Sequence, residues 1–271
     1  WWEAEQLRSV VPSARYIGAL VDHHSGHLHP LNYTLGLARA AEQLGVQIFE
    51  HSAVTQLDRG TKPVLRTALG QVQADFVVLA GNAYVRGIAP ELDSRIMPVG
   101  TFIGATEPLG EAKARALIGN DMAVADINWA LDYFPLSSDH RLLVGGRASY
   151  STLPPPNLRG TMQRRMTRVF PQLAGVKLDY VWGGYVDISL SRAPHWGRLG
   201  NNVYFAPGFS GHGIAATGLA GRVIAEAIRG QSDRLDVFGK LRHLPFPGGR
   251  LFRTPMLVAA MAWYKLRDAL W

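Results

Sequence analysis

A glycine turn around a histidine is the feature of this sequence with the clearest chemical consequence. Gly208, Gly211 and Gly213 lie close together in the chain, and His212 stands between the last two. Glycine has no Cβ, so backbone N–H groups in such a turn can approach a ligand closely and φ can be positive. A helix starting there adds the partial positive charge of its first N–H groups, which favours anions such as phosphate. The alternative is a turn that serves only close helix packing, with His212 bonding a carbonyl.

A second group of possible ligands is the histidine cluster near the amino end. His23, His24, His27 and His29 lie on a segment that ends at Pro30. Their spacing fits no standard metal-ligand pattern, and neither cysteines nor a set of carboxylates accompany them. The sequence therefore predicts no metal site.

The glycine turn needs a strand before it and a helix after it. Residues 203–206 form an apolar run that is typical of a strand buried on both faces. From Ile214 onward the apolar positions fall on one helical face. These positions are Leu219, Val223, Ile224, Ala227 and Ile228.

A similar strand and turn occur earlier in the chain, at residues 75–83, where a buried strand ends in the small residues Ala80 to Ala83. We expect this corner and the glycine turn to converge on one flat ligand. Upstream of it the pattern predicts a helix over 31–44, a strand over 46–50 and a hairpin of short strands. The hairpin strands are expected at 53–59, 64–68 and 71–74.

Composition indicates a globular chain. The sequence has 271 residues, 47% of them hydrophobic, and no cysteine, so disulfides and thiolate ligands are excluded. No apolar run reaches the roughly 18 residues that cross a bilayer, and the cytoplasm is the expected location. The net charge of +7 is dispersed and does not form one basic stripe, which argues against nucleic acid as the partner.

Five motifs in order resemble the flavoproteins of the D-amino-acid oxidase superfamily, and within it the gamma-glutamylputrescine oxidase type. They lie at residues 26–57, 74–84, 95–109, 141–147 and 202–228. The resemblance implies FAD as cofactor. It implies the following cofactor-binding residues: Val54, Ala80, Gly81, Asn82, Gly208, Phe209, Ser210, Gly211, His212, Gly213 and Ile214.

The first hundred residues contain no G-x-G-x-x-G, the motif that holds the FAD pyrophosphate in such proteins. We therefore expect a carboxyl-terminal portion of a longer protein, inactive alone and dependent on an amino-terminal segment or on self-association.

The resemblance also bears on the substrate. Relatives that oxidise free amino acids place an arginine, which clamps the carboxylate, where this chain has Tyr185. The difference favours an amine, whose ammonium group Asp187 could attract. Asp187 could equally be a strand-end turn residue, and Tyr185 a packing residue. Arg147 could bind an acidic substrate group, or pair with Asp132 or Asp139, and His212 is the fourth candidate near the substrate.

The expected fold is α/β (α+β): a partial, Rossmann-like FAD-binding domain of the glutathione-reductase type and a substrate domain built on an antiparallel sheet with flanking helices. We expect part of the FAD-binding domain, with an entry into the substrate domain, at 1–83, the substrate domain at 84–195, a return to the FAD domain at 196–235, and a tail and helix at 236–271. The favoured function is oxidation of an amine C–N bond. The alternatives are an amino-acid oxidase acting on glycine, sarcosine or a D-amino acid, a fragment or interaction module that binds no flavin, and a basic module for nucleic acid or membrane.

Overall fold

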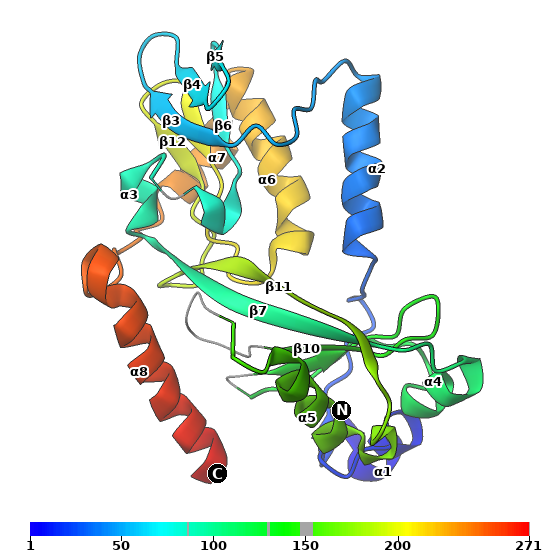
Figure 1. Ribbon diagram of the computed structural model, residues 1–271. Helices are drawn as coiled ribbons and strands as arrows, with labels where there is room; N and C mark the ends of the chain where they lie inside the picture. Colours follow the sequence, from blue (N-terminus) through cyan, green and yellow to red (C-terminus); the bar gives the residue numbers. More distant parts are fainter. Residues whose placement is uncertain (86, 129–130, 147–153, 271) are drawn as a thin grey trace. The chain divides into compact units, whose positions relative to one another are not determined.

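The computed structural model describes residues 1–85, 87–128, 131–146 and 154–270 (Figure 1). The chain divides into two compact units. The first unit comprises Trp1–His29, Gly100–Gly184 and Leu257–Trp271, and the second comprises Pro30–Val99 and Tyr185–Met256. These divisions differ from the predicted boundaries at residues 84 and 196, and the functional assignment of the segments stays a prediction.

The first unit is built on a five-stranded sheet in the order β11-β7-β10-β9-β8, in which β7–β10, β10–β9 and β9–β8 are antiparallel. Helices α1, α4 and α5 share one apolar core with it, formed around Leu7, Phe134 and Met166. An antiparallel sheet with helices agrees with the predicted fold class. The elements are β1 Trp2–Glu3, α1 Ala4–Val10, β2 Gly18–Ala19, β7 Ile96–Thr106, α4 Glu111–Leu117, β8 Val124–Ala125, β9 Asp132–Phe134, β10 Leu143–Gly146, α5 Leu158–Val169, the 3-10 helix η2 Pro171–Leu173 and β11 Leu178–Ser189.

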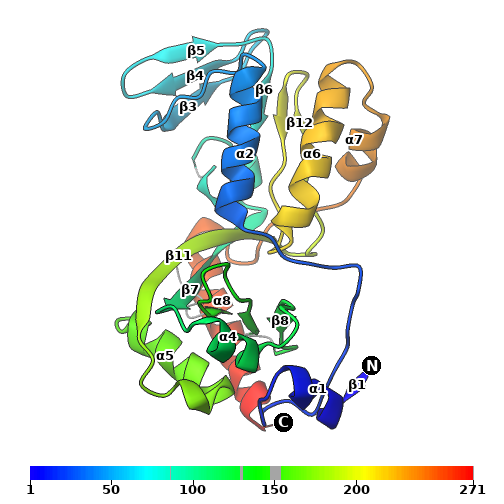
Figure 2. The same cartoon turned by 90° about the vertical axis from the view of Figure 1, so that its right-hand side faces the viewer.

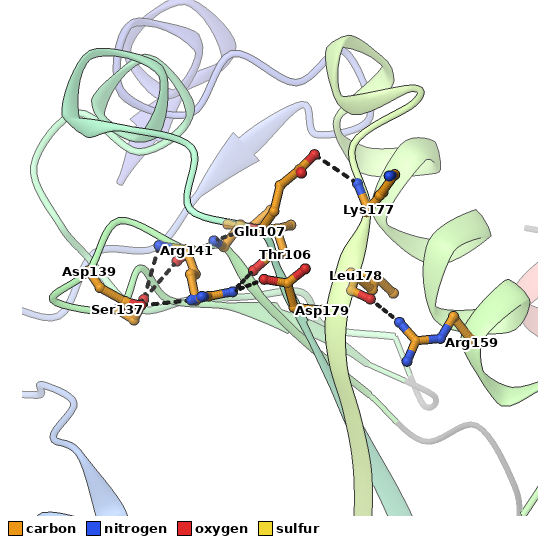
Figure 3. Close-up of polar contacts among 10 residues, drawn as sticks. Thr106, Glu107, Ser137, Asp139, Arg141, Arg159, Lys177, Leu178 and Asp179 are labelled. Atoms are coloured by element: carbon orange, nitrogen blue, oxygen red, sulfur yellow. Dashed lines mark hydrogen bonds and ion pairs between the residues drawn. The ribbon is translucent and has the colours of Figure 1, made fainter.

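Arg141 joins three segments of this unit (Figure 3). Its Nη1 donates to the Thr106 carbonyl and to Asp179 Oδ2, both at 2.6 Å, and its Nε donates to Asp139 Oδ2 at 2.7 Å. The Leu142 N–H also donates to Thr106 Oγ1 at 3.0 Å. These bonds tie the segment just before β10 to the end of β7 and to the start of β11.

The second unit contains a mixed three-stranded sheet, β12-β13-β6, and a separate antiparallel sheet, β3-β4-β5. In the first of these, β13 runs parallel to β6, and both faces bear apolar residues. Val77, Leu79 and Phe205 belong to one core cluster, and Tyr204 packs with α6 in another. The elements are α2 Pro30–Gln43, β3 Val54–Asp58, β4 Val64–Thr67, β5 Gln71–Gln73, β6 Val77–Leu79, the 3-10 helix η1 Asn82–Tyr84, α3 Pro90–Asp93, β12 Gly197–Leu199, β13 Val203–Phe205, α6 Gly213–Ile228 and α7 Asp233–Gly239. Figure 2 shows α6 beside α7, and helix α8, Gly249–Leu270, ends the chain.

A buried ion pair fixes the start of α8 to the second unit. Arg253 Nη2 lies 3.0 Å from Asp93 Oδ1, and both side chains are 1% exposed. Arg253 also donates to the carbonyls of Asp93 and Ile96. Breaking a buried ion pair by removing one partner is strongly destabilising, so this pair fixes the local geometry.

The predicted strand over residues 46–50 is wrong. This segment forms neither helix nor strand, and Val46, Ile48 and Phe49 are 52%, 48% and 70% exposed. A strand requires a neighbour that satisfies its backbone, and no strand pairs with this segment in the described structure. The helix expected over 31–44 is present as α2, but none of its residues is buried.

Candidate functional site

The two small-residue corners lie at one edge of the β12-β13-β6 sheet. Leu79 and Phe205 are register partners at the ends of parallel strands β6 and β13. The Ala206 N–H donates to the Leu79 carbonyl at 3.2 Å, so the segments leave the sheet together. Because carboxyl ends of adjacent parallel strands meet at one edge, this is where α/β sheets bind ligands. The two corners therefore follow neighbouring strand ends, as expected, and the ligand between them stays a prediction.

Asp187 shapes the glycine turn. Its carboxylate accepts hydrogen bonds from the backbone N–H groups of Gly208 and Phe209, the latter at 3.1 Å, and its side chain is buried. The Asp187 carbonyl accepts from the Ser210 N–H at 2.9 Å. Burial raises the pKa of Asp187, while the two backbone hydrogen bonds act in the opposite direction. In this arrangement both carboxylate oxygens face the turn.

Asn82 connects the first corner to the segment that carries Asp187. Its Nδ2 donates to the Tyr185 carbonyl at 3.0 Å, and its Oδ1 accepts from the Asp187 N–H at 3.2 Å. Asn82 has a φ of +50°, a left-handed conformation that asparagine tolerates better than most residues. The side chain was predicted to contact a cofactor, and in the structure its amide ties the first corner to the backbone of Tyr185 and Asp187.

The start of α6 has the properties of an anion site. No side chain caps its amino terminus, so its first N–H groups keep their hydrogen-bonding capacity. Gly211 has a φ of +93°, and an added Cβ there would meet nothing within 4 Å. His212 and Ile214 are exposed beside it. An uncapped helix of 16 residues next to an open glycine fits a phosphate-bearing group such as FAD.

Gly208 has a different role. Its φ is +83°, and an added Cβ would lie 2.9 Å from the backbone nitrogen of His195. Close packing against the segment before β12 therefore requires a glycine here. The packing interpretation of the turn therefore applies at Gly208, and the ligand interpretation stays a prediction for Gly211.

The remaining predicted residues are spread more widely. Val54 lies in β3, in the separate three-stranded sheet. Arg147 lies outside the described residues. Of the two aspartates considered as its partners, Asp132 pairs with Arg165 and Asp139 with Arg141.

Sequence reasoning assigned no role to Tyr84. Its ring lies 5.8 Å from that of Tyr185 in an edge-to-face arrangement, and Tyr84 is 65% exposed. An aromatic pair therefore stands beside the Asn82 bridge. The signal was present in the sequence, because Tyr84 follows the small-residue corner directly.

In the described part of the chain, no group of three or more histidine or acidic side chains is arranged to hold a metal ion. His27 Nε2 lies 3.0 Å from the Asp121 carbonyl. The same residues contain no helix long and apolar enough to cross a membrane.

Comparison with known proteins gives the family. Residues 1–227 match the model of the FAD dependent oxidoreductase family, DAO. The chain belongs to this family. It is 47% identical over 269 residues to the gamma-glutamylputrescine oxidoreductase of Escherichia coli K12, and this match covers 99% of the chain and 63% of the relative. It is 43% identical over 272 residues to a probable oxidoreductase, OrdL, of Haemophilus influenzae, covering 98% and 62%.

Solved structures show the same fold at lower identity. Glycine oxidase from Geobacillus kaustophilus superposes with a TM-score of 0.75 at 19% identity, covering 90% of this chain and 67% of that one. L-proline dehydrogenase from P. horikoshii gives 0.71 at 21% identity, covering 89% and 69%. The chain thus has the fold of this flavoprotein family and spans less than two thirds of the length of the two curated relatives above.

Proposed function

We propose that the protein takes part in the FAD-dependent oxidation of a C–N bond in an amine of the gamma-glutamylputrescine kind. Membership of the family supports the cofactor, and the E. coli relative at 47% identity supports the substrate class. The structural observation that carries the proposal is the shared edge of β6 and β13. There the corner at Ala80 to Ala83 and the segment that leads from Ala206 into α6 leave the sheet next to each other.

Bound FAD would accept the hydride from the carbon beside the amine, and the protein contributes binding and orientation. In this proposal the N–H groups of Gly213 and Ile214 at the start of α6 hold phosphate, and Gly211 leaves space for it. The Asp187 carboxylate fixes the turn before these groups by accepting hydrogen bonds from the N–H groups of Gly208 and Phe209.

The substrate side of the proposal rests on the tyrosine pair. Tyr185 stands where amino-acid-oxidising relatives carry an arginine, so the chain offers no matching clamp for an α-carboxylate at that position. Aromatic rings attract alkylammonium groups through their faces. Tyr84 and Tyr185 therefore favour an amine over glycine or a D-amino acid.

A chimera tests this function. The region of the E. coli relative that matches this chain is replaced by residues 1–271, and turnover of gamma-glutamylputrescine is compared with that of glycine and sarcosine. We expect the amine to be preferred and a yellow, stoichiometric flavoprotein to form. A chimera that retains flavin but prefers glycine would overturn the substrate class. A folded chimera without flavin would overturn the cofactor role of the corners.

A further inference from the structure

A cavity of about 600 Å³ lies between β12 and α7, within the second unit. Its lining comes from residues 195–198, from Phe205 in β13, and from α7 with the two residues after it. The volume falls within the range of small-molecule sites in proteins. No residue of the corners at Ala80 to Ala83 and Gly208 to Gly213 lines it, so the proposed flavin contacts lie outside this cavity.

Two polar side-chain atoms in the lining are buried without a hydrogen-bond partner. Trp196 is 1% exposed and His195 is 8% exposed, and neither Trp196 Nε1 nor His195 Nδ1 meets a partner among the residues that the structure describes. Buried polar atoms in proteins nearly always bond to protein, to water or to a ligand. An indole N–H can only donate, so Trp196 requires an acceptor such as a carbonyl oxygen.

The backbone of β12 offers further hydrogen-bonding groups beside the cavity. The His195 N–H donates to the Pro207 carbonyl at 3.0 Å, in the register of the antiparallel β12–β13 ladder. Because backbone groups alternate along a strand, those of Trp196 and Arg198 point away from β13. β12 is the end strand of its sheet, and no described strand pairs with that edge. The amide groups of an extended peptide can match such an edge.

Charged side chains of the lining stand at both ends of α7. Asp233 is the first residue of the helix and Lys240 follows the last, and both are exposed. Residues seven apart lie on one face of a helix, and a rise of 1.5 Å per residue separates these two by about 10 Å. Neither has an ion-pair partner among the described residues, whereas Asp236 between them lies 3.6 Å from Arg198. Three residues of extended chain, at about 3.3 Å each, span the same length.

We propose that this cavity binds a short zwitterionic peptide, of about three residues, that carries an apolar side chain. Its ammonium group lies at Asp233 and its carboxylate at Lys240, while an amide carbonyl accepts the hydrogen bond of Trp196 Nε1. The apolar side chain packs against Phe205 and Phe238, the latter of which stacks on Trp196 with 4.3 Å between ring centroids. This site goes beyond the proposed function and does not depend on it, because no flavin contact takes part.

Calorimetric titration of the full chain tests the proposal, with the tripeptide Ala-Leu-Ala as the probe. We expect saturable binding, and an acetyl group on the amino end or an amide on the carboxyl end should weaken it by about fivefold or more, because each removes a charge. Trp196→Phe keeps an aromatic ring but removes the N–H, so it should weaken binding by about fivefold. Trp182→Phe, in β11 and outside the cavity, is the matched control and should bind as the unaltered chain does.

Paired changes in protein and peptide locate the two ends of the ligand. In Lys240→Met the amidated and the free peptide should bind equally, and in Asp233→Asn acetylation should no longer weaken binding, because each variant lacks the partner of the altered group. Lys62→Met, whose side chain pairs with Asp75 on the surface, is the control and should keep both differences.

Absence of saturable binding by the unaltered chain would show that water alone occupies the cavity, and it would overturn the proposal. Unchanged affinity in folded Trp196→Phe, or an effect of amidation that persists in Lys240→Met, would also overturn it. Circular dichroism shows whether Trp196→Phe folds, and if it does not, the change at exposed Lys240 decides. Leucine binding as tightly as the tripeptide would assign the cavity to a free amino acid and would equally overturn the proposal.

Discussion

At the residue scale, Asp187 makes a testable contribution to the glycine turn. In Asp187→Asn the new amide oxygen can accept only one of the two backbone donors, and the NH₂ group then faces the other. A buried donor left unpaired costs about 1–3 kcal/mol, so we expect a loss of that size in the free energy of unfolding. Thermal or denaturant unfolding measures it.

The control is Asp75→Asn, whose carboxylate makes an exposed ion pair with Lys62. Such pairs contribute little, so its stability should change by less than about 0.5 kcal/mol. Equal losses in the two variants would contradict the assigned role of Asp187.

His195 gives a prediction for pH. Burial, followed by the neighbouring charges of His243 and Arg95, lowers the pKa of His195 to about 3 from its usual 6.5. The unfolded chain therefore binds a proton at a higher pH than the folded chain does. The contribution of neutral His195 to the free energy of unfolding is therefore complete above about pH 6.5, and it is lost progressively as the pH falls toward 3.

We therefore expect Tm to fall as the pH is lowered from 7.5 to 5. The slope of Tm against pH should be smaller in His195→Gln. The burial of His243, whose ring lies 4.2 Å from that of His195, lowers its pKa also and leaves part of the slope in place. Phe238→Leu, a core change without a titrating group, should lower Tm while keeping the slope. An unchanged slope in His195→Gln would refute this assignment.

The sequence predicted which residues surround the turn, but it did not predict the hydrogen-bond partners of their polar groups. Asp187 and Asn82 were candidates for substrate and cofactor contact, and the structure shows both bonded to backbone atoms. Those partners lie 22 and 105 residues away in the sequence. Spacing along one chain does not show such pairings, because they depend on how strands from distant segments align.

At the element scale, the strand–turn–helix from Val203 to Ile228 makes three glycine substitutions informative. Gly208→Ala combines positive φ with a close approach to His195 and should cost the most, about 1–3 kcal/mol. Gly211→Ala meets open space, so only its φ opposes the change, at about 1 kcal/mol. Gly218→Ala, inside α6 with nothing within 4 Å of the new Cβ, should stabilise by about 0.5–1 kcal/mol.

Denaturant midpoints of the three variants give this order. Equal effects at Gly208 and Gly211 would show that the contact with His195 does not restrict position 208.

Element prediction succeeded where the local pattern and the neighbours agree. The helices α2 and α6 and the hairpin strands β3, β4 and β5 lie within a few residues of their expected positions. It failed at residues 46–50, where the composition is that of a strand but none of the described strands pairs with the segment. Strand formation depends on pairing, whereas helices satisfy their own backbones.

At the scale of the whole molecule, the distribution of exposed apolar residues predicts how the chain behaves in solution. Leu35 and Phe49 are 44% and 70% exposed, while Leu92, in the core, is fully buried. We expect Leu35→Glu/Phe49→Glu to leave the free energy of unfolding within about 0.5 kcal/mol of the original, because exposed side chains contribute little to stability. Leu92→Glu should unfold the second unit.

The double variant also separates apolar attraction from charge. It lowers the net charge from +7 to +5, and a charge nearer zero by itself favours association. We expect the double variant to scatter less light and to bind less of a hydrophobic dye. Because its charge change acts in the opposite direction, such a decrease would arise from the lost apolar surface. Leu69→Glu, at an isolated residue that is 98% exposed in the turn between β4 and β5, should change both signals least. If it changed them as much as the double variant, the apolar residues of α2 and of the segment after it would not be the source of association.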